Sequence, residues 1–206
     1  MDVLKNFIVF EGGDGSGTST ALARIKSRAA ASGLDAFFTA EPTDRETGIL
    51  LRGVLSGKHK LSAPHLACLF AADRAVHLFA PDGIIEACKK KLVFCDRYVL
   101  SSIVYQGIEC GEDAPKKMNA YFPAPEKLFF FDLDAQKAIS RIKGRDKKEI
   151  FETLDFQKKA REAYLKNLDF CRSQGSEVFV LDAGLPPQKI EDAVWNAVTG
   201  SGLVVN

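Results

Sequence analysis

The sequence lacks the features that would mark a membrane-spanning, secreted or disulfide-stabilised protein. Its longest apolar stretches, such as Leu128 to Phe131, are far shorter than the ~20 residues that cross a bilayer. Acidic and glycine residues interrupt the opening segment MDVLKNFIVFEGG, unlike a signal peptide. The five cysteines are odd in number, scattered and never in a C-x-x-C pair, which argues against a disulfide framework or a zinc site. We expect reduced thiols and a soluble, cytoplasmic protein.

Net charge is almost absent as well. The 28 basic and 27 acidic residues leave a formal charge of +1, so no overall field attracts nucleic acid or an anionic membrane. The three histidines, His59, His65 and His77, have neither the spacing of a metal site nor an acidic neighbour in sequence, which favours surface or core positions. We expect no nucleic-acid partner, no membrane partner and no histidine chemistry.

Short apolar runs alternate with stretches of helical period, which is typical of βα units. The 206 residues, without repeat or linker, suit a single domain over 1–206. The runs that predict buried parallel strands are Phe7–Glu11, Ala36–Ala40, Leu92–Asp96, Leu128–Leu133 and Val178–Asp182. The predicted helices are Ser19–Ser32, Thr47–Leu55, Ala63–Lys90 with a break near Pro81, Ser101–Gln106, Lys116–Tyr121, Ala135–Lys143, Phe151–Ser173 and Pro187–Val198. The sequence therefore predicts an α/β fold with a doubly wound five-stranded parallel sheet flanked by helices.

A glycine-rich segment follows the first predicted strand and precedes a helix, which is the context of a nucleoside-triphosphate loop. Gly12, Gly15 and Gly17 can take backbone angles forbidden to other residues, so that successive N–H groups face a phosphate. Ser19 stands where the hydroxyl ligand for magnesium belongs, but Thr18 replaces the lysine of G-x-x-x-x-G-K-[ST]. A glycine-rich turn that merely caps a helix is the alternative. The predicted ATP-binding residues are Gly12, Gly13, Asp14, Gly15, Ser16, Gly17, Thr18, Ser19 and Thr20.

Three further segments follow in order: Leu69 to Arg74 (LFAADR), Asp96 to Tyr98 (DRY) and Ser101 to Gly107 (SSIVYQG). With FEGGDGSG and AEPT, they make the chain resemble the thymidylate kinases over nearly its whole length. The resemblance implies a P-loop nucleoside monophosphate kinase fold and transfer of the γ-phosphoryl group of ATP to thymidine monophosphate. It also implies Mg²⁺, a flexible basic lid and a homodimer. The chain departs from the bacterial pattern at Thr18, at Ala40, where an arginine is expected, and at Thr43-Asp44, which replaces Gly-Gly.

Several implied roles agree with the chemistry of the residues. Phe70 and Arg74, one helical turn apart, can offer a pyrimidine an aromatic surface and a hydrogen-bond donor from one face. Asp96 and Arg97 end a predicted strand, at the edge where ligands bind in open α/β sheets. There the arginine can bridge two phosphates, and the aspartate can hold magnesium through water or orient the arginine. The alternatives are core packing for Phe70 and a structural ion pair between Asp96 and Arg97.

The resemblance gives further residues to the acceptor nucleotide. It implies that Ser102 contacts the base, that Tyr105 excludes a 2′-hydroxyl, and that Asp14 contacts the sugar 3′-hydroxyl unless it caps its own turn. Arg52 is near enough to replace the contact absent at Ala40, as is Arg45. The predicted substrate-binding residues are Asp14, Arg52, Phe70, Arg74, Arg97, Ser101, Ser102, Tyr105 and Gln106. The predicted catalytic residues are Asp96, Arg97, Arg141 and Arg145, and the predicted metal ligands are Ser19 and Asp96.

A basic cluster at about 141–152 resembles the lid of the family. It contains Arg141, Lys143, Arg145, Lys147 and Lys148. A lid arginine that closes over ATP would neutralise charge in the transition state and exclude water, and it could compensate for Thr18. A solvated charged turn is the alternative.

The leading functional hypothesis is a thymidine monophosphate kinase. A nucleotide-binding protein of the same fold with little or no turnover, acting as a sensor or scaffold, is the alternative that Thr18 suggests. A deoxynucleoside kinase shares the fold but requires a base near the sugar 5′-hydroxyl. A signalling GTPase is disfavoured because the sequence has no N-K-x-D motif.

Overall fold

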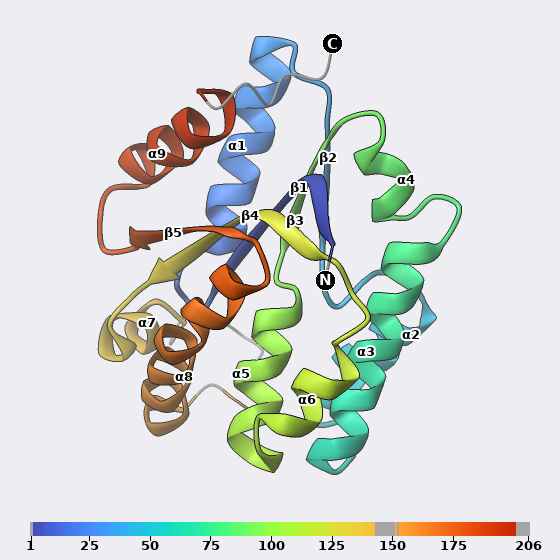
Figure 1. Cartoon of the computed structure of the whole chain (residues 1–206). Helices are drawn as coiled ribbons and strands as arrows, with labels where there is room; N and C mark the ends of the chain where they lie inside the picture. Colours follow the sequence, from blue (N-terminus) through green and yellow to red (C-terminus); the bar gives the residue numbers. More distant parts are fainter. Residues whose placement is uncertain (1, 143–150, 152, 201–206) are drawn as a thin grey trace.

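The computed structural model describes residues 2–142, 151 and 153–200. Five strands form one parallel sheet in the order β2-β3-β1-β4-β5 (Figure 1). The strands are β1 (Val3–Gly12), β2 (Ala36–Ala40), β3 (Leu92–Asp96), β4 (Ala124–Asp132) and β5 (Glu177–Asp182). The helices are α1 (Thr18–Ser32), α2 (Glu46–Leu55), α3 (Ala63–Phe79), α4 (Ile84–Cys88), α5 (Val99–Cys110), α6 (Asp113–Met118), α7 (Ala135–Ile142), α8 (Leu154–Ser173) and α9 (Pro187–Thr199).

The central strand β1 is apolar on both faces because it supplies two cores. Ile8 and Phe10 pack into a core with α1 and α9, while Phe7 and Val9 face α3 and α4 on the other side. Strand β4 alternates in the same way, with Phe129 on the first face. Figure 1 shows α1 and α9 on one side of the sheet and α3, α5 and α8 on the other. The prediction of a doubly wound parallel sheet is confirmed.

The register of the sheet brings several loops to one edge. Phe10 of β1 and Ala40 of β2 are both in register with Asp96 of β3, so the carboxyl ends of these strands lie together. The chain leaves β1 for α1 on one face and β3 for α5 on the other, which opens a crevice between the two connections. This crevice positions the candidate site.

The element boundaries differ from the predictions where polar residues interrupt the pattern. β1 begins already at Val3, and its pairing with β4 shifts register between Leu4 and Ile8, where Asn6 has a φ of 63°. The predicted break near Pro81 is confirmed, since it lies between α3 and α4. α8 begins after Phe151, because Thr153 caps it by accepting a hydrogen bond from the N–H of Phe156. Within the described residues, the structure has no helix that is long and apolar enough to cross a membrane.

Candidate active site

The glycine-rich loop between β1 and α1 uses glycine for two different reasons. Gly15 and Gly17 have φ angles of 80° and 96°, which side-chain-bearing residues rarely adopt. A Cβ atom on Gly15 would also lie 2.6 Å from the carbonyl oxygen of Ala138. Gly12 differs from the prediction, because it ends β1 without a positive φ. Glycine is required at position 12 because no side chain fits there: a Cβ atom would lie 2.5 Å from the hydroxyl of Ser16.

A cavity of about 440 Å³ lies at this loop. The predicted ATP-binding residues that line it are Gly13, Asp14, Gly15, Ser16, Gly17, Thr18, Ser19 and Thr20. Two arginines, Arg97 and Arg141, line it as well. Arg141 donates hydrogen bonds to the carbonyl oxygens of Gly15, at 3.4 Å, and Ala183, at 3.1 Å. Arg141, in the last turn of α7, thus brings a cation to the loop that lacks its lysine. Arg145 and the rest of the predicted lid up to 150 lie outside the described residues.

A second cavity, of about 570 Å³, opens beside the first between α2, α3 and α5. The predicted substrate-binding residues all line it, namely Asp14, Arg52, Phe70, Arg74, Arg97, Ser101, Ser102, Tyr105 and Gln106. Phe70 is half-buried at its wall, and Gln106 has a buried carbonyl oxygen without a hydrogen-bond partner among the described residues. An unpaired buried acceptor is costly unless a ligand satisfies it.

Arg74 is held in this cavity by a buried polar network. It is 1% exposed and donates to one carboxylate oxygen of Glu41, from Nε at 2.9 Å and from Nη2 at 2.7 Å. It also donates to Ser102, at 3.1 Å, and to Asn119. The other Glu41 oxygen lies 3.1 Å from Nδ1 of His77. His77 therefore does have an acidic neighbour. The sequence did not indicate it, because Glu41 follows β2 whereas His77 lies on α3.

Arg52 and Arg45, the two proposed replacements for the missing arginine at Ala40, bond within the protein. Arg52 donates to the carbonyl oxygens of Pro42, at 2.7 Å, and Thr43, at 2.5 Å, so it braces the loop after β2 while lining the cavity. Arg45 pairs with Asp82, at 2.6 Å, and does not line the second cavity.

Arg97 lies at the junction of the two cavities. Its guanidinium donates to the carboxylate of Asp14 at 2.6 Å and to the carbonyl oxygen of Gly12 at 3.0 Å, and it lies 5.3 Å from the ring centroid of Tyr105. The sequence suggested Asp96 as its structural partner, and the structure shows Asp14 instead. Asp14 also accepts a bond from Gln157, at 2.9 Å, and so does not cap its own turn. The φ of Arg97, 67°, is strained for a side-chain-bearing residue, as is common at functional sites.

Asp96 faces the start of α1. One of its oxygens accepts a hydrogen bond from the hydroxyl of Ser19 at 2.6 Å, and the other is buried without a partner among the described residues. This pair suits magnesium, which usually keeps several waters and needs only one or two protein oxygens beside a phosphate. No cluster of three or more His, Cys, Asp or Glu side chains that could form a metal cage occurs in the described part of the chain.

Glu11 is a buried carboxyl within the segment FEGGDGSG, and it was not among the predicted site residues. One of its oxygens accepts from the N–H groups of Tyr98 and Ser101, and the other accepts from the hydroxyls of Ser101 and Tyr164. Burial raises the pKa of Glu11 to about 7, against the lowering effect of the Ser101 hydrogen bond and the Arg97 charge. Burial and the charge of Asp14 also raise the pKa of Tyr105, so its phenol is neutral. Glu11 thus fixes the segment that follows Arg97.

The relationship between the two cavities is set by three shared residues. Asp14, Ser19 and Arg97 line both cavities. The cavity at the glycine-rich loop and the cavity between α2, α3 and α5 therefore meet at a carboxylate, a hydroxyl and a guanidinium group. Such a junction suits transfer of a charged group from one bound molecule to another.

Comparison with known proteins identifies the family. Residues 10–194 match the family model described as thymidylate kinase. A protein of Treponema pallidum named as a thymidylate kinase is 43% identical over 174 residues, which cover 84% of this chain and 83% of that protein. A thymidylate kinase homologue from Methanocaldococcus jannaschii is 42% identical over 161 residues, covering 78% and 80% of the two chains. One from Aeropyrum pernix is 34% identical over 173 residues, covering 83% and 82%. The chain therefore belongs to the thymidylate kinase family.

Proposed function

We propose that this chain transfers the γ-phosphoryl group of ATP to thymidine monophosphate, with the donor at the glycine-rich loop and the acceptor in the cavity between α2, α3 and α5. The observation that carries this proposal is that Asp14, Ser19 and Arg97 line both cavities. A phosphoryl group can pass between two nucleotides only where their phosphates meet in one preorganised place.

The residues of the junction divide the work. Arg97 bridges the two phosphates and gains most when charge spreads between them. Asp14 orients Arg97 through their 2.6 Å ion pair and contacts the 3′-hydroxyl of the sugar. Magnesium would be held by the Ser19 hydroxyl and, through water, by Asp96, and it would neutralise charge on the β- and γ-phosphates.

The residues of the acceptor cavity recognise the nucleoside. Phe70 stacks on the pyrimidine, and Arg74, kept in place by Glu41, donates to a base carbonyl. Ser102 and Gln106 complete the polar edge, and Tyr105 lies against the sugar. A ribose 2′-hydroxyl would meet this ring, which favours deoxyribose.

A coupled ADP-release assay with thymidine, deoxyuridine, deoxycytidine and deoxyguanosine monophosphates, and with thymidine itself, tests the proposal. The highest kcat/KM is expected with thymidine monophosphate. Faster turnover of thymidine would show a deoxynucleoside kinase. Calorimetric binding of nucleotides without any ADP release would show the sensor or scaffold.

The stacking role of Phe70 has its own test. Phe70→Ala should weaken thymidine monophosphate binding by roughly 1 to 3 kcal/mol, the usual range for loss of one aromatic stacking partner. Phe37→Ala, at the sheet edge and outside both cavities, is the matched control. Equal effects of the two variants would remove Phe70 from the acceptor site.

We also propose a homodimer formed through α2 and α3. These helices pack against each other and expose Ile49, Val76 and Phe79, which are 60%, 40% and 58% accessible. Phe79→Glu should shift the sedimentation velocity of the protein toward that of a monomer. A cytoplasmic location remains a prediction.

A further inference from the structure

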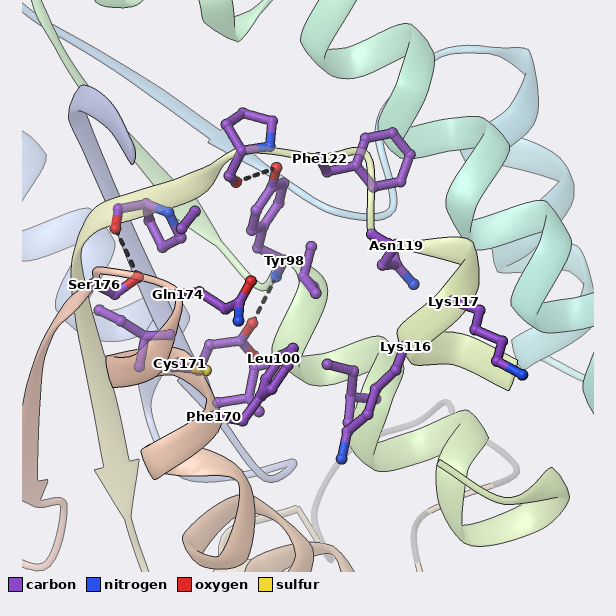
Figure 2. A pocket seen from close by; sticks show the side chains of 18 residues that line it. Tyr98, Leu100, Lys116, Lys117, Asn119, Phe122, Phe170, Cys171, Gln174 and Ser176 are labelled. Atoms are coloured by element: carbon purple, nitrogen blue, oxygen red, sulfur yellow. Dashed lines mark hydrogen bonds between the residues drawn. The ribbon is translucent and has the colours of Figure 1, made fainter. Parts of the chain in front are cut away.

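A third cavity, of about 280 Å³, lies apart from the glycine-rich loop. It is lined by residues of α5, α6, the start of β4 and the end of α8 (Figure 2). Its walls are mostly apolar and include Leu100, Ile103, Phe122, Leu128 and Phe170. The proposed nucleotide-binding residues do not line it, so it requires an explanation of its own.

Most of the polar groups on its walls are bonded within the protein. The Tyr98 hydroxyl donates to the carbonyl oxygen of Pro123 at 3.1 Å, and the Ser176 hydroxyl donates to that of Pro125 at 2.7 Å (Figure 2). Glu11 accepts from the N–H of Tyr98 at 2.9 Å. At the edge, the Lys116 ammonium pairs with Glu112 at 2.8 Å. Lys117 lines the cavity as well, but it is exposed to solvent. A charged ligand would lose its hydration against the apolar walls, so they select uncharged molecules.

The size of the cavity sets the class of ligand more closely. A cavity of about 150 Å³ lined by Leu, Ile and Phe is large enough to bind benzene. This one is nearly twice as large and is flanked by the Phe122 and Phe170 rings. An uncharged bicyclic aromatic molecule, such as indole, matches it.

Tyr98 connects this cavity to the acceptor cavity, because it lines both. Its ring lies 5.1 Å from the guanidinium carbon of Arg74, and its backbone directly follows Arg97. Glu11 bonds the N–H groups of Tyr98 and Ser101, so the first turn of α5 forms a wall of the third cavity and a support of Arg97.

We propose that the third cavity is an effector site for an uncharged bicyclic aromatic molecule, whose binding strengthens the binding of thymidine monophosphate through Tyr98. The cavity is open in the conformation in which Arg74 lies against Tyr98 and Arg97 bonds Asp14. A ligand that fills it stabilises that conformation, and the same conformation binds the acceptor. The coupling rests on the acceptor cavity assigned under the proposed function.

The test is calorimetric titration of the full chain with indole, with and without saturating thymidine monophosphate, and the reverse titration with and without indole. Each ligand is expected to raise the affinity of the other by the same factor, about fivefold or more, because linkage is reciprocal. Ala120→Trp, at an exposed position of the cavity mouth, should abolish indole binding. Ala31→Trp, exposed near the end of α1, is the matched control and should leave indole binding unchanged.

Four results would overturn the proposal. The first is that indole does not bind to protein that binds thymidine monophosphate, and the second is that Ala120→Trp does not affect indole binding. The third is that indole binds without changing the affinity for thymidine monophosphate. The fourth is that the two ligands compete. The titration with thymidine monophosphate alone reports separately on the proposed function. If that nucleotide does not bind at all, the acceptor assignment fails and the coupling fails with it.

Discussion

The hydroxyl of Ser19 donates a 2.6 Å hydrogen bond to the carboxylate of Asp96, which joins the first turn of α1 to the end of β3. The two residues are far apart in the sequence and meet because β1 and β3 are neighbouring parallel strands. The remaining Asp96 oxygen is buried and accepts no bond from any described residue. Asp96 thus has an acceptor oxygen without a partner among the described residues beside the glycine-rich loop, in the place that the proposed function gives to a hydrated cation.

Asp96→Asn should raise the Mg²⁺ concentration needed for half-maximal activity by about 10- to 100-fold, the usual cost of losing a partner of the metal's ligands. The KM for thymidine monophosphate should change little. Asp132→Asn is the control, because Asp132 also ends a strand of the sheet, β4, but pairs with Arg161 at 2.6 Å. An unchanged Mg²⁺ requirement in Asp96→Asn would remove Asp96 from the metal site.

Arg97→Ala should lower kcat by about 100- to 1,000-fold, the range for loss of one preorganised donor to the transition state. The calorimetric affinity for thymidine monophosphate should fall much less, because a bridging guanidinium gains most as charge spreads between phosphates. Circular dichroism must show a native fold. A normal kcat in folded protein would reduce Arg97 to the structural partner of Asp14.

Glu41→Gln should lower the free energy of unfolding by about 3 to 5 kcal/mol, because it leaves the guanidinium of Arg74 buried without its counter-charge. Both side chains of this pair are almost inaccessible, at 1% and 2%. Asp82→Asn breaks the exposed pair with Arg45 and should have little effect. Urea unfolding of the two variants measures the difference, and similar results would mean that Asn119 and Ser102 alone can satisfy Arg74.

The parts of the fold that depend on local pattern were predictable from the sequence. All five strands are apolar runs in the sequence, but only β1, β3 and β4 are largely buried, whereas the edge strands β2 and β5 are partly exposed and the prediction that they are buried was wrong. Pro81 marked the break between α3 and α4. The early start of β1 was not predictable, because Lys5 and Asn6 interrupt the apolar pattern and the strand continues only through an irregular pairing with β4.

The sequence predicted which residues line the candidate site, but it did not predict which residues these side chains bond to. Phe70, Arg74 and Arg97, which belong to two separate motifs, line one cavity as predicted. The pairing of Arg97 with Asp14 depends on how the two strand ends meet, and the bond from Gln157 to Asp14 spans 143 positions. No local signal encodes either contact. Glu11 could have been suspected, because a carboxylate that ends an otherwise apolar buried strand must find partners.

Glu11 should make the stability of the protein fall as pH rises. Its pKa is about 7 in the folded chain and near 4.5 when exposed, so between these values the unfolded chain releases a proton that the folded chain keeps. The free energy of unfolding then decreases with pH, by roughly 3 kcal/mol in total from this group. Glu11→Gln should remove that part of the slope in urea unfolding between pH 5 and pH 8. A slope that persists in the variant would assign it to other groups.

The last prediction concerns the cation missing at Thr18. Thr18 is buried at the first position of α1, and the Arg141 guanidinium lies at the same cavity with a bond to Gly15. If Arg141 supplies the charge that a loop lysine gives elsewhere, Arg141→Ala should lower kcat by about 100-fold. Lys137→Ala, four residues earlier on the exposed side of α7, should not.

Thr18→Lys in the parent chain should leave kcat level or lower it, because the new ammonium would repel Arg141 in a confined site. In the Arg141→Ala background the same substitution should restore a large part of the lost activity. Steady-state kcat at saturating ATP is measured for the parent chain, the two single variants Thr18→Lys and Arg141→Ala, and the double variant. A rise of one to three orders of magnitude from Thr18→Lys alone would show that Arg141 does not replace the lysine. Nucleotide binding without turnover in every variant would instead favour the sensor or scaffold.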